Sequence, residues 1–453
     1  MSDEDHHLAT GSIGAIESFV MAIGGTAPAF SIAVASAAII GDVGTLSIAS
    51  IIYCGIIMFG LVIAFSNLNK VNPNAGASYT WVSTIFSPFL GFVAGWSMLL
   101  SSAIFMVAAT VPAATSTLMI FASDYANDTF AVTFVGAFWL SLITFVVIKG
   151  TKFAYLLQLI MLIAEIIIIT VIVIASLTIF FNQPMHTPEL GWLSPFSFTL
   201  KSFASSATTA LFFYWGWDVT MSLGEETRKG KAEIGALYSI TGLILFFSLM
   251  IFVVLITLTD EEIFRSNSNI LFALAEKIFP SPWSYIAIIC TMLSTIGTIE
   301  GQILQFSRCV FAMSRDNILP HYLSVIHNKW QTPWAATLVM WALGIIFLFC
   351  SSFLPSVNAI LKASISAIGL QICLYMSMTA FASAWHYRHK IHENISSAVY
   401  YVLWPLFGAL SMIAIGVVSL LSTDLNATLL GLGGIAIGVM IYVVRNRLSL
   451  SSS

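Results

Sequence analysis

A succession of long apolar segments, separated by short polar ones, constrains this chain more than any other feature. The 453 residues are 58% hydrophobic and only 8% charged, whereas soluble domains carry about 25% charged residues. Because that composition cannot supply a charged, water-facing surface, the chain needs lipid as its solvent. A membrane-spanning helix takes about 20 mainly apolar residues. We therefore predict an all-α polytopic membrane protein of about twelve transmembrane helices, near residues 12–40, 45–66, 89–118, 131–149, 153–181, 200–224, 233–258, 283–312, 334–353, 358–384, 397–421 and 427–445.

The basic residues are distributed unequally between the connecting loops. Loops on the cytoplasmic side of a membrane are enriched in Lys and Arg. If the chain starts in the cytoplasm, the outer side receives only Lys201, Arg265 and Lys277, and Lys362 falls within a helix. We therefore expect both termini in the cytoplasm and an even number of helices. The other basic residues then fall on the inner side, namely Lys70, Lys149, Lys152, Arg228, Lys229, Lys231, Arg308, Arg315, Lys329, Arg388, Lys390, Arg445 and Arg447.

Two of the apolar segments, the first and the sixth, contain helix-breaking sequences. Gly and Pro free backbone groups from the helical hydrogen-bond pattern, and in lipid such groups persist only where they are buried in protein or line a cavity. Either break alone is also compatible with simple helix packing. Breaks five helices apart, however, are typical of secondary transporters that bind substrate at the midplane. The two sequences are Gly24-Gly25-Thr26-Ala27-Pro28 and Tyr214-Trp215-Gly216-Trp217-Asp218.

Four motifs, in order along the chain, resemble those of the amino acid–polyamine–organocation permease superfamily. They are NPNAGASYTW (72–81), SPFLGFVAGW (87–96), ALFFYWGWDVTMSLGEET (210–227) and QFSRCVFAMSRDNILP (305–320). The resemblance implies one transmembrane domain over residues 1–453 with a LeuT-like fold. Two inverted five-helix repeats, near 12–181 and 200–384, are then followed by two extra helices near 397–445. It also implies a bacterial inner-membrane location and a small amino acid or amine as substrate.

The first interruption is a candidate site for an anion. Exposed N–H groups at the start of a half-helix carry the positive end of the helix dipole. We expect an amino acid carboxylate to bind there, as the resemblance also implies. Ser101, in the third helix, is a further candidate for the lining of the pocket. The expected binding residues at the interruption are Gly24, Gly25, Thr26 and Ala27.

The sixth helix offers groups for a cation. Tyr214, Trp215 and Trp217 flank Gly216, and one or two of these rings are expected to hold an ammonium by cation–π attraction. Asp218 follows directly, and a carboxylate in the membrane normally faces a cavity or a partner. We expect Asp218 to lie near the substrate, although an internal hydrogen-bonding role fits it equally well.

Two further acids are expected inside the membrane. Glu300 precedes Arg308 by eight residues, about 12 Å along a helix, which places it at substrate depth facing helices one and six. Glu165 stands where several proton-coupled relatives carry a lysine in helix five, so the resemblance implies a role in proton coupling. Desolvation makes a carboxyl group better suited to load and release a proton. A purely structural role is the alternative for both acids.

Acidic and basic residues also gather at the predicted cytoplasmic ends of helices one, six and eight. Glu17 lies near the start of helix one, Glu225 and Glu226 close helix six, and Arg308 lies in helix eight. These residues are candidates for a gating cluster of ion pairs. Simple anchoring at the membrane surface is the alternative.

These observations favour a secondary active transporter of amino acids or related amines that works by alternating access, coupled to protons or exchanging substrates. The acids favour cationic substrates, and a polyamine (putrescine-like) transporter is the alternative. A channel or a membrane enzyme is remote, because the histidines lie at the N-terminus, in loops or at helix ends rather than beside the membrane acids. We expect no cofactor or metal and no nucleic-acid partner. The sequence leaves the oligomeric state open.

Overall fold

A computed structural model describes residues 8–266, 269–422 and 425–451. The side chains of Leu200, Asn358, Lys362 and Ser366, and those of residues 422–430 and 446–451, lie outside the description. In these residues the regular secondary structure is helical, apart from an isolated bridge between Ile13 and Thr227. The helices are α1 (Ala15–Thr26), α2 (Pro28–Val43), α3 (Ser47–Val71), α4 (Ser78–Ile85), α5 (Pro88–Phe121), α6 (Thr129–Ile148), α7 (Thr151–Phe180), α8 (Leu200–Tyr214), α9 (Val219–Ser222), α10 (Lys231–Thr257), α11 (Asp260–Arg265), α12 (Ile270–Ile278), α13 (Ile286–Arg315), α14 (Trp334–Ser351), α15 (Val357–His386), α16 (Ile395–Ala398), α17 (Trp404–Ser422) and α18 (Leu425–Ser451).

The predicted all-α, multi-pass architecture is confirmed. Within the described residues, nine helical segments are long and apolar enough to cross a membrane. The first of them, Ala15–Val71, holds two passes. The interrupted pair α8 and α9 supplies another pass, and the apolar helix Gly431–Arg445 within α18 supplies the last. The chain is therefore a multi-pass, all-α membrane protein.

The surface of the bundle is apolar, and polar side chains point inward. Helix α7 illustrates this arrangement. Phe153, Ile160 and Ile167 are each more than half exposed, whereas Gln158 and Glu165 on the same helix are buried. This reversal of the pattern of soluble helices is expected when lipid is the solvent. The buried acids of the sequence therefore face the protein interior.

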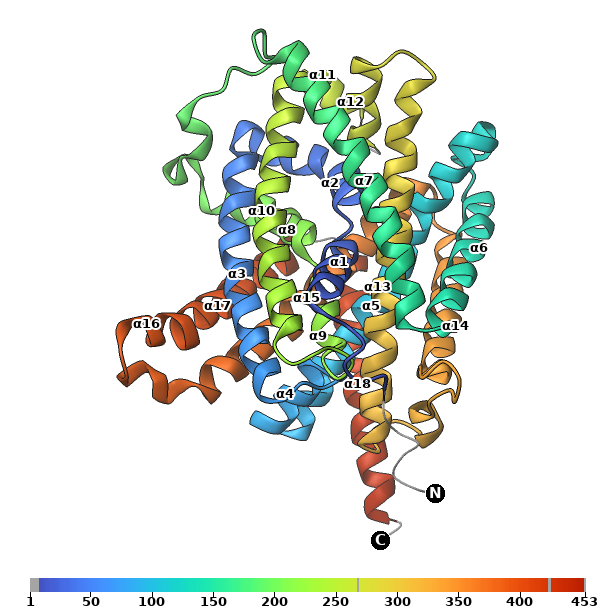
Figure 1. The fold of residues 1–453 in the computed structure, drawn as a ribbon, viewed down its shortest axis with the longest axis vertical. Coiled ribbons are helices and arrows are strands. Elements are labelled where there is room, and N and C mark those ends of the chain that lie inside the picture. The colour runs from blue at the N-terminus through green and yellow to red at the C-terminus, as the bar shows by residue number, and fades with distance from the viewer. Residues whose placement is uncertain (1–7, 267–268, 423–424, 452–453) are drawn as a thin grey trace.

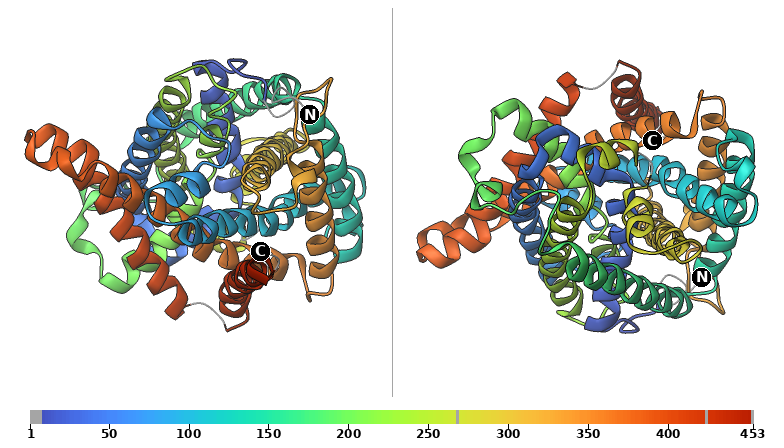
Figure 2. Two further views of the ribbon diagram at one scale, coloured as in Figure 1. Left: turned by 90° about the horizontal axis from the view of Figure 1, so that it is seen from below. Right: turned by 90° about the horizontal axis from the view of Figure 1, so that it is seen from above.

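Helix α13 lies inside the bundle, with the other helices around it (Figure 2). The chain enters α1 and leaves α18 at one end of the bundle, and α11 and α12 lie at the opposite end (Figure 1). The face of α13 toward α1 and α9 carries small or polar residues at helical spacing, from Ser294 to Arg308. These residues bring the central helix into contact with both interrupted segments.

Both predicted helix interruptions are present. Helix α1 ends at Thr26, Ala27 adopts a left-handed conformation with φ of 51°, and Pro28 begins α2. Pro is favoured at this first helical position, where its missing N–H has no helical partner to lose. In the second interruption, Gly216 has φ of 116°, which L-residues with a side chain rarely adopt. Glycine is therefore required there by the backbone.

Candidate functional site

The two interruptions lie directly against one another. A Cβ atom added to Gly25 would come 2.5 Å from the carbonyl oxygen of Gly216, and one on Gly216 would collide with the backbone of Gly25. A Cβ on Gly301 of α13 would lie 3.2 Å from the Cα of Gly25. Three glycines therefore allow α1, the α8–α9 connection and α13 to meet at backbone distance.

The backbone groups of the first interruption are hydrogen-bonded within the protein. Thr298 of α13 donates from Oγ1 to the carbonyl oxygen of Gly25 at 2.7 Å. Ser31 donates to the carbonyl oxygen of Thr26 at 3.2 Å, and the N–H of Ala27 donates to Gly24 at 3.2 Å. The carbonyl oxygens of Gly25 and Thr26 are therefore engaged within the protein, and the binding role of Gly24, Gly25, Thr26 and Ala27 stays a prediction.

Glu165 of α7 reaches the start of α2. Its Oε1 accepts a hydrogen bond from the N–H of Ala29 at 2.7 Å and another from the hydroxyl of Ser294 at 3.0 Å. The side chain is buried. A carboxylate is stabilised at a helix N-terminus by the dipole and by the unpaired N–H groups. The chain's own acid therefore occupies the place where the sequence predicts the carboxylate of a ligand.

The three aromatic residues beside Gly216 point in different directions. Tyr214 donates its hydroxyl to the carbonyl of Ile51 in α3, and Trp217 packs edge-on against Phe65 of α3 with ring centroids 5.1 Å apart. Trp215 instead donates its indole N–H to the hydroxyl of Tyr375 in α15 at 2.7 Å. Trp215 is thus the ring that faces away from α3.

Asp218 sits at the centre of a buried hydrogen-bond network. Its Oδ2 accepts from the amide of Gln305 at 2.6 Å and from the hydroxyl of Tyr375 at 2.8 Å. Its Oδ1 has no hydrogen-bond partner among the described residues, although the residue is 1% exposed. A buried acceptor left open in this way is costly, so it is a candidate contact for a ligand donor.

Glu300 and Ser101 are both buried, and their role in the pocket stays a prediction. Glu300 precedes Gly301 by one residue, about 100° around α13, so it lies off the face that contacts α1 and α9, and both its carboxylate oxygens lack a partner among the described residues. The spacing from Arg308 sets depth but not direction. Ser101 is buried and donates to the carbonyl of Met98 in its own helix.

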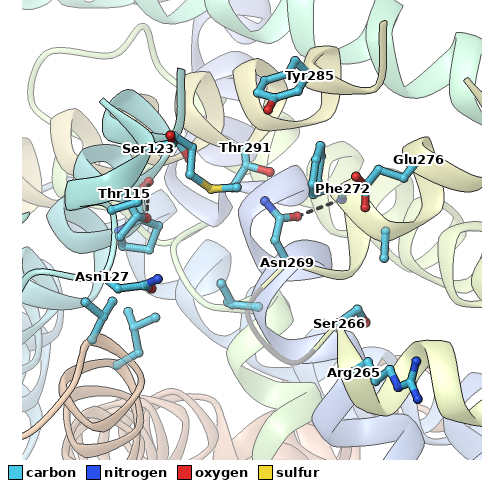
Figure 3. A pocket seen from close by; sticks show the side chains of 18 of the residues that line it. Thr115, Ser123, Asn127, Arg265, Ser266, Asn269, Phe272, Glu276, Tyr285 and Thr291 are labelled. Atoms are coloured by element: carbon cyan, nitrogen blue, oxygen red, sulfur yellow. Dashed lines mark hydrogen bonds between the residues drawn. The ribbon is translucent and has the colours of Figure 1, made fainter. Parts of the chain in front are cut away.

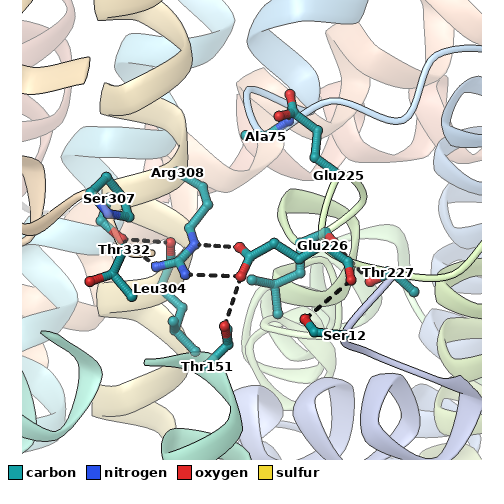
Figure 4. A network of polar contacts seen from close by, with 12 residues as sticks. Ser12, Ala75, Thr151, Glu225, Glu226, Thr227, Leu304, Ser307, Arg308 and Thr332 are labelled. Atoms are coloured by element: carbon teal, nitrogen blue, oxygen red, sulfur yellow. Dashed lines mark hydrogen bonds and ion pairs between the residues drawn. The ribbon is translucent and has the colours of Figure 1, made fainter. Parts of the chain in front are cut away.

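The end of the bundle where α1 begins is closed by a buried ion pair (Figure 4). Arg308 and Glu226 are fully buried, with Nε 2.9 Å from Oε1, and the second guanidinium contact lies at 3.4 Å. Thr151 of α7 donates to Glu226 at 2.8 Å. The pair joins α13 to the segment after α9, and Thr151 adds α7. We call this the sealed end.

A second ion pair at the sealed end joins three of the sequence motifs. Arg315 forms two hydrogen bonds to Glu225, at 2.7 and 3.0 Å, and Glu225 also accepts from the N–H of Ala75 at 2.9 Å. Glu17 lies outside these ion pairs: its carboxylate accepts from the N–H of Gly14 at 3.0 Å and caps α1. Segments 72–81, 210–227 and 305–320 therefore meet at one place.

The opposite end of the bundle contains a cavity of about 940 Å³ (Figure 3). Its walls come from α2, α5, α11, α12, α13 and α15, and include Thr115, Asn269 and Thr291. Thr291 precedes Ser294 by one turn of α13, about 4.5 Å along the axis. The cavity therefore ends close to Glu165. We call this the open end.

Sequence reasoning missed Gln305, Tyr375, Thr298 and Thr151. The first three contact Asp218 or the first interruption, and Thr151 supports Glu226. The polar residues of α13 repeat at three- and four-residue intervals, which marks one helix face, so Thr298 and Gln305 could have been found. Tyr375 carries no such signal, because one tyrosine in an apolar segment does not identify its partner.

The interrupted helices, the buried acid between them and the sealed and open ends define a membrane transporter architecture. The chain matches the amino acid permease family over residues 13–442. It belongs to that family, and the family resemblance predicted from the four motifs is confirmed.

Three curated relatives have different transport activities. The chain is 25% identical to the serine/threonine exchanger SteT of Bacillus subtilis over 65% of each chain. It is 23% identical to the low-affinity putrescine importer PlaP of Escherichia coli, over 83% of this chain and 81% of the importer. It is 21% identical to the branched-chain amino acid permease BcaP of Lactococcus lactis, over 77% and 76%. These relatives are transporters rather than enzymes, as the sequence predicts.

Proposed function

We propose that this chain is a secondary carrier of amino acids or related organic amines. The observation that carries the proposal is Asp218, a buried acid at the second interruption with one carboxylate oxygen open. It lies in the part of the fold where the two interrupted segments and α13 meet. The family and its relatives, which exchange or import amino acids or putrescine, support the same function.

The two ends of the bundle support an alternating-access cycle. We infer that the open end faces the outside and the sealed end faces the cytoplasm of a bacterial inner membrane, following the distribution of Lys and Arg. Substrate then enters through the cavity, and the ion pairs of Glu226 with Arg308 and Glu225 with Arg315 separate as the cytoplasmic side opens. Each pair joins elements that have to separate when the cytoplasmic side opens.

Transport assays in liposomes test the proposal. Purified protein should accumulate or exchange labelled amino acids or diamines, and Asp218→Asn should weaken apparent affinity by about tenfold or more, because a hydrogen bond to a charged group contributes about 1.5–3 kcal/mol. Glu189→Gln, which changes an exposed loop acid, is the control. Liposomes that take up none of these compounds would contradict the carrier function.

Proton coupling through Glu165 is proposed separately. The acid is buried and lies near the inner limit of the cavity, where a proton from the open end has a short path. Glu165→Gln should abolish the dependence of net uptake on pH while leaving substrate exchange intact. Uptake that keeps its pH dependence in the variant would remove Glu165 from the coupling mechanism.

The two inverted repeats also remain a proposal. Their boundaries near 12–181 and 200–384 bracket α1–α7 and α8–α15, and each begins with an interrupted helix. This correspondence supports the repeat assignment. The helices after residue 395 then lie outside the repeats.

A further inference from the structure

In α9 the hydroxyls of Thr220 and Ser222, which can donate or accept, lack partners among the described residues, but several other unpartnered atoms near the interruptions are acceptors only. They include Oδ1 of Asp218, Oε1 of Gln305 and Oε1 of Gln158. The amide nitrogens of these glutamines already donate, Gln305 to Asp218 and Gln158 to the carbonyl of Gly297. An ammonium group has three donors and no acceptor, so its chemistry complements these open atoms.

Donors suited to a carboxylate are scarce at the first interruption. In the first turn of α2, Pro28 has no N–H, the N–H of Ser31 bonds to Ala27, and the N–H of Ala29 donates to Glu165. Among the described residues, the N–H of Phe30 is the donor left open in this turn, and it lies next to the Ala29 N–H that Glu165 accepts. Trp217 has an open indole N–H, but its ring packs toward α3 against Phe65. A ligand carboxylate at α2 would therefore have to displace Glu165 or bind beside a like charge.

We propose that Glu165 is a specificity residue: its carboxylate fills the α2 N-terminus, so that the carrier prefers amines without a carboxylate to the matching α-amino acids. The inference rests on the proposed transport function and narrows its substrate class. Putrescine and ornithine form such a matched pair, because ornithine is putrescine with one added carboxylate. Cadaverine with lysine and isobutylamine with valine extend the comparison to other side chains.

The position of Glu165 relative to the cavity allows this selection to act on an arriving ligand. Thr291 lines the cavity, and Ser294, one turn further along α13, donates to Glu165. The charged residues that line the cavity are of both signs, with Glu262 paired to Lys277 at 2.6 Å. The cavity walls therefore carry no net charge that selects among substrates. The selection is assigned instead to the acids deeper in the bundle.

The test compares binding within the matched pairs. Wild-type protein in detergent is titrated with putrescine and ornithine, cadaverine and lysine, and isobutylamine and valine, and binding is measured by thermal shift and calorimetry. We expect the amine of each pair that binds to do so at least about tenfold more tightly than its amino acid. Equal or tighter binding of the amino acids would overturn the inference while leaving the transport function standing.

Variants of Glu165 test the residue itself. Glu165→Ala frees the N–H of Ala29 and should shift the preference toward the amino acids by at least about tenfold. Glu165→Gln keeps an acceptor of similar size and should shift it less. Glu189→Gln makes the same carboxylate-to-amide change on an exposed loop and serves as the matched control, with the wild-type preference. If Glu165→Ala protein still binds amines with an unchanged ratio of amine affinity to amino acid affinity, the assignment is overturned.

The outcomes separate this role from the others. If Glu165 only carries protons, Glu165→Gln changes the pH dependence of uptake and leaves the amine-to-amino-acid ratio unchanged in both variants. If Glu165→Ala does not fold, Glu165→Gln still has to lower the ratio for the inference to stand. If no compound binds and none is taken up by liposomes, the transport function and this inference both fall.

Discussion

The two ends of the bundle use ion pairs in different settings. At the sealed end, Arg308 and Glu226 are fully buried, and Arg315 with Glu225 lies partly buried beside them. At the open end, Lys277 and Glu262 form a pair of similar length on the wall of a cavity, with Glu262 42% exposed. The contact distances are alike, so burial decides how strongly each pair holds its elements together.

The largest effect is expected from Arg308→Ala. This change leaves Glu226 buried without its partner, and breaking a buried pair in this way costs about 3–5 kcal/mol. The free energy of unfolding in detergent should fall by that amount, and the sealed end should open more often. The double variant Arg308→Ala with Glu226→Gln should recover part of the loss. If Arg308→Ala alone is as stable as wild type, the ion pair is not buried inside the protein in the membrane.

Cysteine labelling should separate the two ends next. Thr115→Cys lines the cavity, whereas Ser307→Cys lies fully buried beside Arg308. In a Cys350→Ser background, which removes the exposed native thiol, a water-soluble maleimide should modify position 115 about 100-fold faster, because a buried site reacts only when it opens. Equal rates would mean that the sealed end is open in solution.

A smaller loss is expected from Arg315→Ala. The Arg315 and Glu225 side chains are 30% and 19% exposed, so water partly compensates for a lost partner. We expect a loss of about 1–2 kcal/mol, between the values for exposed and buried pairs. Unfolding measurements on Arg315→Ala and Arg308→Ala in parallel compare the two losses of free energy of unfolding. An equal loss in both variants would show that burial does not determine how much each ion pair contributes.

The smallest effect is expected at the open end, from Lys277→Ala. Burial alone would raise the pKa of Glu262, but the hydrogen bonds from Lys277 and Thr259 hold that pKa below its ordinary value. A lowered pKa in the folded state stabilises the protein above the unfolded pKa of about 4.3. That contribution disappears as pH falls through the folded pKa.

The variant should therefore lose about 0.2–1 kcal/mol at pH 7, and the difference from wild type should shrink as pH falls and Glu262 becomes protonated. Thermal unfolding between pH 3 and 7 measures this. Arg265→Ala, which removes the exposed pair with Glu261, is the control. A difference that grows as pH falls would contradict the assignment.

The sequence was sufficient for the passes and the interruptions, because each depends on local composition. Gly216 illustrates this: a glycine between aromatics in an apolar segment predicts a break, and its φ of 116° requires one. The direction of side chains depends instead on tertiary packing. The spacing of Glu300 from Arg308 fixes a height along α13 without fixing an angle, and the structure puts Glu300 off the face toward α1 and α9.

Glu165 shows the same limit more clearly. Its burial follows from the position in an apolar segment, but its partner, the N–H of Ala29, is 136 residues away in sequence. The geometry of a helix start and a facing acid could not be anticipated from either segment alone. The sequence therefore predicts a ligand carboxylate at the start of α2. In the structure the carboxylate of Glu165 lies there.

The bridge between Ile13 and Thr227 has a mechanical consequence. The N–H of Ile13 donates to Glu226, and that of Arg228 donates to Ile13, so the chain before α1 is tied to the chain after α9. Gly25 and Gly216 form a second contact between the same two half-helices. Two contacts at different positions along α1 and α9 oppose the rotation of one half-helix relative to the other. We therefore expect α1 and α9 to move together in any conformational change of the transport cycle.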